Sequence, residues 1–158
     1  MVAIIAVALT STACRAQPSP APASASTPAS AAAPASATAA AGDRTTVHLG
    51  DDPWTVLLAG PDGMRRLPDF DGADGMLFDF GKEVEPSAVA FIMDGVAFPL
   101  DIAWFGAGGE PLGRATMATC PAQPCPTYAP DAPYRWAIEA PVGAFAAVDP
   151  EAGLSLDR

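Results

Sequence analysis

The sequence contains no asparagine, a single lysine (Lys82) and a single histidine (His48). One histidine cannot form a His-based metal cluster, and the G-x-S-x-G motif of serine hydrolases is absent. Basic residues are scarce, because eight of them face eighteen acids and give a formal net charge of −10. Nucleic-acid-binding surfaces concentrate Lys and Arg. We therefore expect no metal, no cofactor and no nucleic-acid partner, with His48 on the surface.

Long hydrophobic runs are also missing. The most apolar N-terminal stretch, residues 2–10, is far shorter than the roughly 20 residues that a membrane-spanning helix needs. Such a stretch is typical of the apolar region of a secretory signal, so we expect residues 1–13 to be a signal peptide. The small residues Ser11, Thr12 and Ala13 directly precede Cys14. This arrangement resembles the lipobox of bacterial lipoproteins, and the resemblance implies that Cys14 is acylated.

Residues 14–43 consist almost wholly of Ala, Pro, Ser and Thr after the cysteine. A segment without bulky apolar side chains cannot bury enough surface to offset its ordering entropy, so we expect a disordered linker. The predicted organisation is a lipid-anchored protein exported to the outer face of the cytoplasmic membrane, or to the periplasm or outer membrane. The alternative is a free Cys14 in a secreted or cytosolic protein. The folded domain then spans residues 44–158.

Within that domain, short apolar runs are separated by Gly, Pro and Asp clusters, as in all-β proteins. Strands are expected at 54–58, 76–80 and 98–104, and residues 106–111 are expected to turn the last strand back through 112–118. The alternation over 98–104 is typical of a half-buried strand. Residues 134–139 are expected to place Tyr134, Trp136 and Ile138 inward and Arg135 and Glu139 outward. Short helices are expected only at 61–67 and 141–148.

Four segments carry a family resemblance: GMLF (75–78), FIM (91–93), PLDIAW (99–104) and YAPDAPYRWAIE (128–139). In this order and spacing, with a glycine at Gly63, they resemble the domain-of-unknown-function family 192. The resemblance implies a mainly β fold, a compact jelly-roll-like sandwich or barrel that is often exported or lipid-anchored and has no established activity. The chain departs from the family's F-W-M-K-N-T pattern after Phe91, so a ligand site on those polar groups is not expected.

The polar positions that do match the family pattern are Asp101 and Arg135. Both are expected on the outward side of their strands, where they form either a cross-strand ion pair or a ligand site beside Trp104 or Phe105. The sequence DFDGADG (69–75) lacks the Gly and Glu that a calcium loop requires at fixed positions, and so predicts an acidic turn. Asp94–Gly95 likewise predicts a turn between strands.

Cys120 and Cys125 lie in a Pro-rich segment of a chain expected outside the cytoplasm. In an oxidising compartment this spacing predicts a structural disulfide, since a redox dithiol usually shows C-x-x-C at the start of a helix. The overall hypothesis is a non-enzymatic lipoprotein domain that binds an envelope component or a protein partner. The alternative is an enzyme acting on an envelope glycan or another hydrolytic substrate, with Asp101 as acid or base, which needs a second carboxylate nearby.

Overall fold

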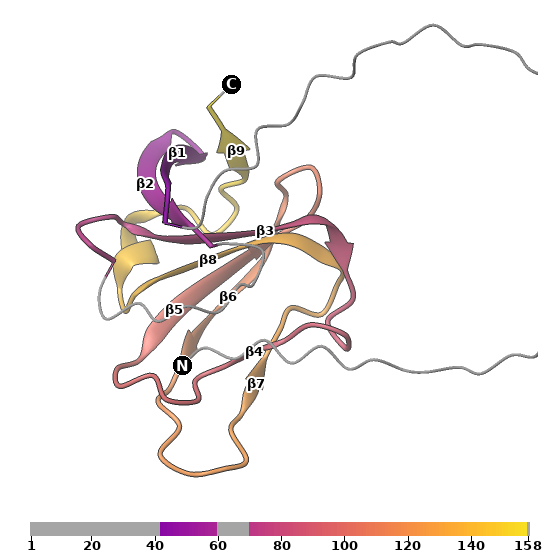
Figure 1. Ribbon diagram of the computed structural model, residues 1–158. Coiled ribbons are helices and arrows are strands. Elements are labelled where there is room, and N and C mark those ends of the chain that lie inside the picture. The colour runs from indigo at the N-terminus through magenta and orange to yellow at the C-terminus, as the bar shows by residue number, and fades with distance from the viewer. Residues whose placement is uncertain (1–41, 60–69, 158) are drawn as a thin grey trace, which may run out of the picture. The chain divides into compact units, whose positions relative to one another are not determined.

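The computed structural model describes residues 42–59 and 70–157, in which nearly all regular secondary structure is β-strand (Figure 1). Nine strands and one turn of 3-10 helix are present in these ranges: β1 (Arg44–Leu49), β2 (Asp52–Leu58), β3 (Gly75–Val84), β4 (Phe91–Ile92), β5 (Leu100–Phe105), β6 (Pro111–Met117), β7 (Thr127–Tyr128), β8 (Tyr134–Pro141), η1 (Ala144–Ala147) and β9 (Leu154–Leu156). The mainly β prediction is confirmed.

Several sequence predictions fall outside the described residues. They are the signal peptide, the acylated Cys14, the linker, Gly63, Asp69 and the short helix at 61–67. Within the described ranges, no helix is long and apolar enough to cross a membrane.

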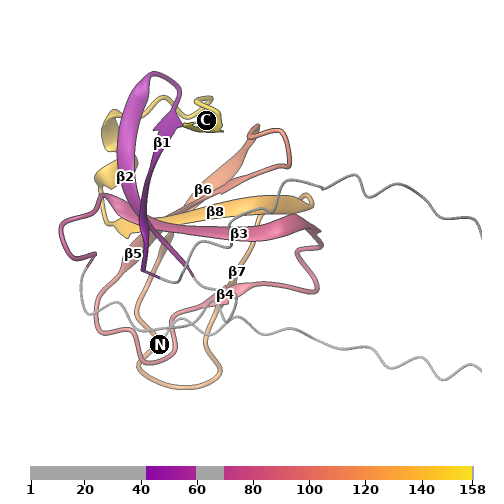
Figure 2. The same cartoon turned by 45° about the horizontal axis from the view of Figure 1, so that its top comes forward.

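Seven strands form one mixed sheet in the order β6-β5-β8-β3-β2-β1-β9. The pair β2–β3 is parallel, and the other neighbours in this sheet are antiparallel. The remaining two strands, β4 and β7, pair antiparallel with each other and lie on one side of the large sheet, as both views show (Figures 1 and 2). The strand β8 therefore runs through the middle of the large sheet, between β5 and β3.

Each face of the large sheet carries its own hydrophobic core. The first core joins residues of β1, β2, β3, β5, β8, β9 and η1, and includes Trp54, Leu77 and Phe145. The second core lies on the opposite face, where Met76, Phe78 and other residues of the large sheet meet the strand β4 and the segment that follows it. Because successive side chains of a strand point to opposite faces, β3 supplies Leu77 to one core and its two neighbours to the other.

The three strands and the hairpin expected from the sequence are present. Gly95 has φ of 71° in the turn that follows β4, as the Asp94–Gly95 pair predicted. The prediction that residues 98–104 form a half-buried strand is wrong, because Ala103 and Phe105 are buried in the first core while Ile102 is buried in the second. Both faces of β5 are covered, because a hydrophobic core lies on each side of the sheet.

The expected placement along β8 is confirmed in part: Tyr134, Trp136 and Ile138 are buried and Arg135 is not, but the three buried residues do not share one face. Tyr134 packs in the second core, whereas Trp136 and Ile138 pack in the first. The change of face coincides with a register shift in the β3–β8 pairing, which falls between Asp79 and Val84 of β3 and opposite the step from Trp136 to Tyr134. Glu139, expected outward, is only 1% exposed, because both faces of the central strand are covered. The helix expected over 141–148 is present as the single 3-10 turn η1.

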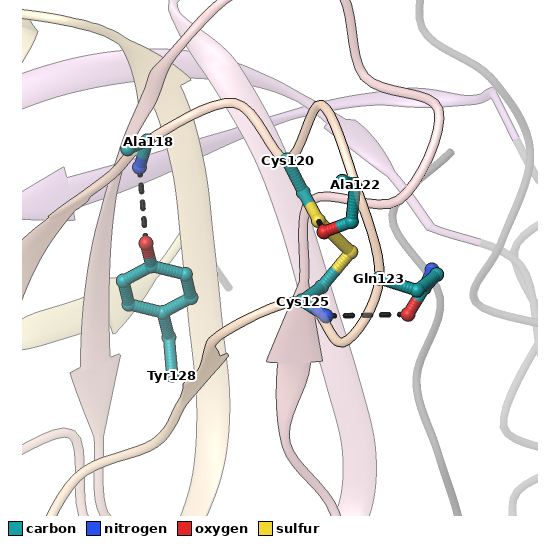
Figure 3. Close-up of a disulfide and its surroundings, with 6 residues drawn as sticks. All are labelled: Ala118, Cys120, Ala122, Gln123, Cys125 and Tyr128. Carbon is teal, nitrogen blue, oxygen red and sulfur yellow. Dashed lines mark hydrogen bonds between the residues drawn. A yellow bond between two sulfur atoms is a disulfide. The ribbon is translucent and has the colours of Figure 1, made fainter.

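The predicted disulfide between Cys120 and Cys125 is present, with the two Cα atoms 5.5 Å apart (Figure 3). It closes the loop between β6 and β7. The Tyr128 hydroxyl accepts a hydrogen bond from the Ala118 N–H at 3.1 Å, which joins the two ends of the loop. Cys120 forms an isolated bridge with Asp94 and packs against the second core, which attaches the loop to the domain. The disulfide therefore restricts the segment between β6 of the large sheet and β7 of the small sheet.

We predict that replacing both cysteines by serine lowers the free energy of unfolding by about 2 kcal/mol, the chain-entropy value for so short a loop. Urea unfolding of wild type and the Cys120→Ser/Cys125→Ser variant measures the difference. In parallel, the intact mass of the wild type should gain two alkyl groups only after reduction. Alkylation at Cys120 and Cys125 without reductant would contradict the disulfide.

Candidate functional site

A cleft of about 510 Å³ opens where the first core reaches the surface. One side is formed by the start of β2 and the residues just before β3, and the other by the end of β8 and the turn η1. Its lining residues are small, apolar or acidic: Asp52, Pro53, Trp54, Ala73, Asp74, Pro141, Ala144, Ala147 and Val148. An indentation with an apolar lining and a few polar groups is the usual form of a binding site.

The η1 wall of the cleft is held at its start by Asp101. This carboxylate accepts a hydrogen bond from the Gly143 N–H at 2.7 Å and a second from the Thr116 hydroxyl at 2.6 Å. Asp101 lies on β5 and Thr116 is its partner on β6, so the anchor belongs to the sheet. Gly143 has φ of 86°, in the left-handed region that favours glycine, and it is the residue before η1. Asp101 thus fixes where the turn begins.

Arg114 of β6 holds the other end of the same wall. Its guanidinium donates hydrogen bonds to three main-chain carbonyls at the end of η1: Phe145 O at 3.3 Å, Val148 O at 2.9 Å and Asp149 O at 2.6 Å. The guanidinium carbon also lies 5.4 Å from the centre of the Phe145 ring. A planar guanidinium with five donors can reach several carbonyl oxygens at once, and two of these oxygens, those of Phe145 and Asp149, also accept main-chain hydrogen bonds from Val148 and Ala152.

The floor of the cleft is formed by stacked aromatic rings. The indole of Trp54 lies stacked on the ring of Phe145, with centroids 5.0 Å apart and planes 8° from parallel. This contact joins β2 to η1 across the base of the cleft. With Asp101 and Arg114 holding the turn from the sheet side, the walls are positioned before any ligand arrives, which lowers the entropic cost of binding.

The residues singled out from the sequence lie elsewhere. The hypothesised ion pair between Asp101 and Arg135 is wrong, because Asp101 bonds Thr116 and Gly143 while Arg135 bonds Asp79 at 3.1 and 3.3 Å. The Arg135 guanidinium also stacks on Trp136, with its carbon 4.1 Å from the ring centre. Register explains the difference: Asp101 lies opposite Ala140 on β8, five residues beyond Arg135.

Trp104 and Phe105, expected beside a bound ligand, are 3% and 1% exposed in the two cores. Neither ring offers a surface for a sugar to stack on, and that part of the prediction is wrong. Asp101 does not line the described cleft, and both of its oxygens accept hydrogen bonds. Its observed contacts make it a positioning residue for the cleft wall, and they do not supply the acid or base role of the alternative hypothesis.

Glu139 is the unexpected polar residue of the core. Its cross-strand partners are Met76 on β3 and Ile102 on β5, so its carboxyl points to the apolar second core. Its Oε1 atom is buried without a hydrogen-bond partner, as is Nε1 of Trp104 on the neighbouring strand. Burial raises the pKa of Glu139 to about 8, because the charged form loses its hydration there. Glu139 therefore retains its proton at neutral pH.

The remaining candidates behave as surface groups. His48 lies 2.8 Å from a carboxylate oxygen of Asp157, and the acidic turn at 70–73 closes through the Ala73 N–H on the Phe70 carbonyl. Among the residues with described positions, no three His, Cys, Asp or Glu side chains are grouped to hold a metal ion.

The sequence did not predict the roles of four residues. Asp52 and Asp74 line the cleft, Arg114 holds its wall, and Glu139 is buried. Asp52 and Asp74 stand in turn-like sequences, DDP and ADG, which indicate a turn but not a cleft. Arg114 occupies a position that a strand pattern assigns to solvent. Only the apolar surroundings of Glu139, in AIEAP, offered a signal that this acid is enclosed.

Comparison with known proteins agrees with the fold. The sequence profile of the family DUF192, described as "Uncharacterized ACR, COG1430", matches residues 59–157. No curated protein matches the chain. Among solved structures, the chain is similar to a proposed transcription regulator from Sinorhizobium meliloti 1021, at 21% identity and a TM-score of 0.56. The alignment covers 75% of this chain and 97% of that one.

Glu139 gives a prediction about pH. Its pKa is raised above the usual 4.5, so folding favours the protonated form. The contribution of protonated Glu139 to the free energy of unfolding is fully present below about pH 4.5. It is lost as the pH rises to about 8, and the total loss is a few kcal/mol. Between pH 5 and 8, unfolding free energies should therefore fall more steeply in wild type than in Glu139→Gln, which cannot ionise.

The exposed Glu83→Gln variant is the matched control, since it removes a carboxylate from the surface of β3. It should follow the wild-type slope in urea unfolding at each pH. Parallel curves for wild type and Glu139→Gln would show that Glu139 ionises in the folded protein at its ordinary pKa.

Proposed function

The chain belongs to the family DUF192, and we propose that it is an extracytoplasmic lipoprotein whose β domain binds an envelope component or a protein partner without transforming it. The observation that carries this proposal is the cleft between β2 and η1. Its walls are held in place by the sheet, and its lining is largely apolar. This is the construction of a preformed binding site.

Location outside the cytoplasm is supported by the disulfide and by the N-terminal sequence. A structural disulfide such as Cys120–Cys125 persists in oxidising compartments and is rare in the cytosol. The apolar residues 2–10 and the cysteine that follows Ala13 suit export and acylation. Residues 15–42, rich in Ala and Pro, suit a tether between a lipid-bearing Cys14 and the domain.

A role in transcription is not proposed on the strength of the Sinorhizobium protein. At 21% identity, the likeness extends to the fold alone. The formal charge of −10 also disfavours contact with a phosphate backbone, because such contacts depend on Lys and Arg.

Acylation is tested by metabolic labelling with an alkyne fatty acid. The wild type should be labelled, and Cys14→Ala should lose the label completely, because the acylated thiol is removed. The Cys120→Ser/Cys125→Ser variant serves as the control and should label like wild type. Equal labelling of Cys14→Ala and wild type would end the lipoprotein proposal.

Binding at the cleft is tested by a photo-crosslinking side chain in the full-length protein on intact cells. Placed at Ala147, which lines the cleft, it should capture a discrete envelope partner. Placed at Ala146, the exposed neighbour outside the cleft lining, it should capture several-fold less. Equal yields from the two positions, or none from either, would contradict a binding role for the cleft.

A further inference from the structure

We propose that the cleft receives a lysine or arginine side chain of a partner protein. This inference rests on the proposed function and gives the chemistry of its ligand. Of the described residues that line the cleft, the ionisable ones are Asp52 and Asp74, and both are acids. The other lining residues are Pro, Ala, Val and Trp. A ligand with a positive head and an apolar stem matches both kinds of surface.

Asp52 is placed by the strand it begins. It lies two residues before Trp54 and four before Val56, and these two side chains point into the first core. Asp52 continues their row to the point where the core opens to solvent, because every second side chain of a strand shares a face. It is exposed, and no ion pair or hydrogen bond of its side chain occurs within the described ranges.

Asp74, which lies just before β3, is held against β2 by two hydrogen bonds to Thr55. One of its oxygens, Oδ2, accepts a hydrogen bond from the Thr55 N–H at 2.7 Å, and its own N–H donates to the Thr55 carbonyl at 2.8 Å. These two bonds hold the carboxylate beside the strand that carries Asp52. The position of Asp74 is therefore fixed, while its charge is not matched by any base of the described chain.

The described bases Arg44, Lys82, Arg114 and Arg135 do not line the cleft. Arg44 pairs with Asp71 at 2.7 Å, Arg135 pairs with Asp79, and Arg114 is bound to the carbonyls of the η1 wall. Within residues 42–59 and 70–157, the carboxylates of Asp52 and Asp74 therefore face no base, and a cation is the ligand that complements them.

The opposite wall suits the stem of such a side chain. Pro141, Ala144, Ala147 and Val148 present small apolar groups, and Lys and Arg bury their methylene stems on surfaces of this kind while the charged head stays near water. Carboxylates at the rim then accept charge-assisted hydrogen bonds from the head. Because Asp52 and Asp74 are exposed, each is expected to contribute only about fivefold to affinity.

The test is an NMR titration of the full-length protein, following the amide signals of Ala144, Ala147 and Val148. The probes are blocked tripeptides Gly-X-Gly with lysine, arginine, norleucine or glutamate at the centre, together with glucosamine. Lysine and arginine peptides should shift these signals at millimolar concentration. Norleucine, which keeps the stem but lacks the charge, should bind at least about fivefold more weakly.

Asp52→Asn and Asp74→Asn should each weaken the lysine peptide about fivefold, and the asparagine oxygen at 74 can still accept from Thr55. Asp131→Asn is the matched control, because it removes an exposed acid that does not line the cleft. It should leave binding unchanged. Added salt should weaken the lysine peptide and leave norleucine unaffected.

Each other outcome overturns the inference in a recognisable way. Equal binding of norleucine and lysine shows an apolar site, and the proposed binding function stands without the cation. Preference for glucosamine shows a glycan amine in place of a protein side chain. Equal weakening by Asp131→Asn shows an effect of net charge. If no probe shifts the cleft signals, the cationic ligand is wrong, and the crosslinking comparison at positions 147 and 146 decides the proposed function separately.

Discussion

The central position of β8, paired with β5 on one side and β3 on the other, is the constraint on which the rest of the structure depends. A strand in the middle of a seven-stranded sheet cannot leave a face to solvent unless that face of the whole sheet is open. Here both faces are covered by cores, so every side chain from Trp136 to Ala140 is buried, including Glu139. The same strand ends at Pro141, which lines the cleft.

The cleft owes its form to polar anchors from the sheet and not to its own lining. The turn η1 is only one turn long, and so short a helical segment has little stability of its own in water. Asp101 holds its start through Gly143, and Arg114 holds its end through three carbonyls. Both anchors come from neighbouring strands, β5 and β6, which pair along their length. Two charged side chains, Asp101 and Arg114, thus position the apolar wall through hydrogen bonds to its main chain.

Glu139 and Trp104 differ from these anchors, because each has a buried polar atom without a hydrogen-bond partner. Their buried polar atoms lack hydrogen bonds, and this costs stability, since each group leaves water without a replacement partner. Because Glu139 faces apolar side chains from β3 and β5, the neutral acid is the less costly form. The sheet holds this acid in an apolar place, and the contribution of Glu139 to the free energy of unfolding is consequently larger at acid than at alkaline pH.

Local patterns predicted most of the strands. The alternation at 76–80 and 98–104 identified β3 and β5, and the Gly-rich run at 106–109 identified the β5–β6 hairpin, because these signals act between residues close in sequence. The shared face of Tyr134 and Trp136 was mispredicted, since their change of face coincides with a register shift in the pairing with β3, a strand fifty or more residues earlier in the chain. No local pattern carries that information.

The sequence by itself determined the class of fold, the family, the cystine and the positions of the turns, because each depends on residue types at short spacing or on a matching order of motifs. Only the tertiary structure decided what the polar residues do. It separated Asp101 from Arg135, enclosed Trp104 and Glu139, and brought Asp52 and Asp74 to one cleft. Those outcomes follow from strand order and register, which relate residues that are distant in the chain and close in space.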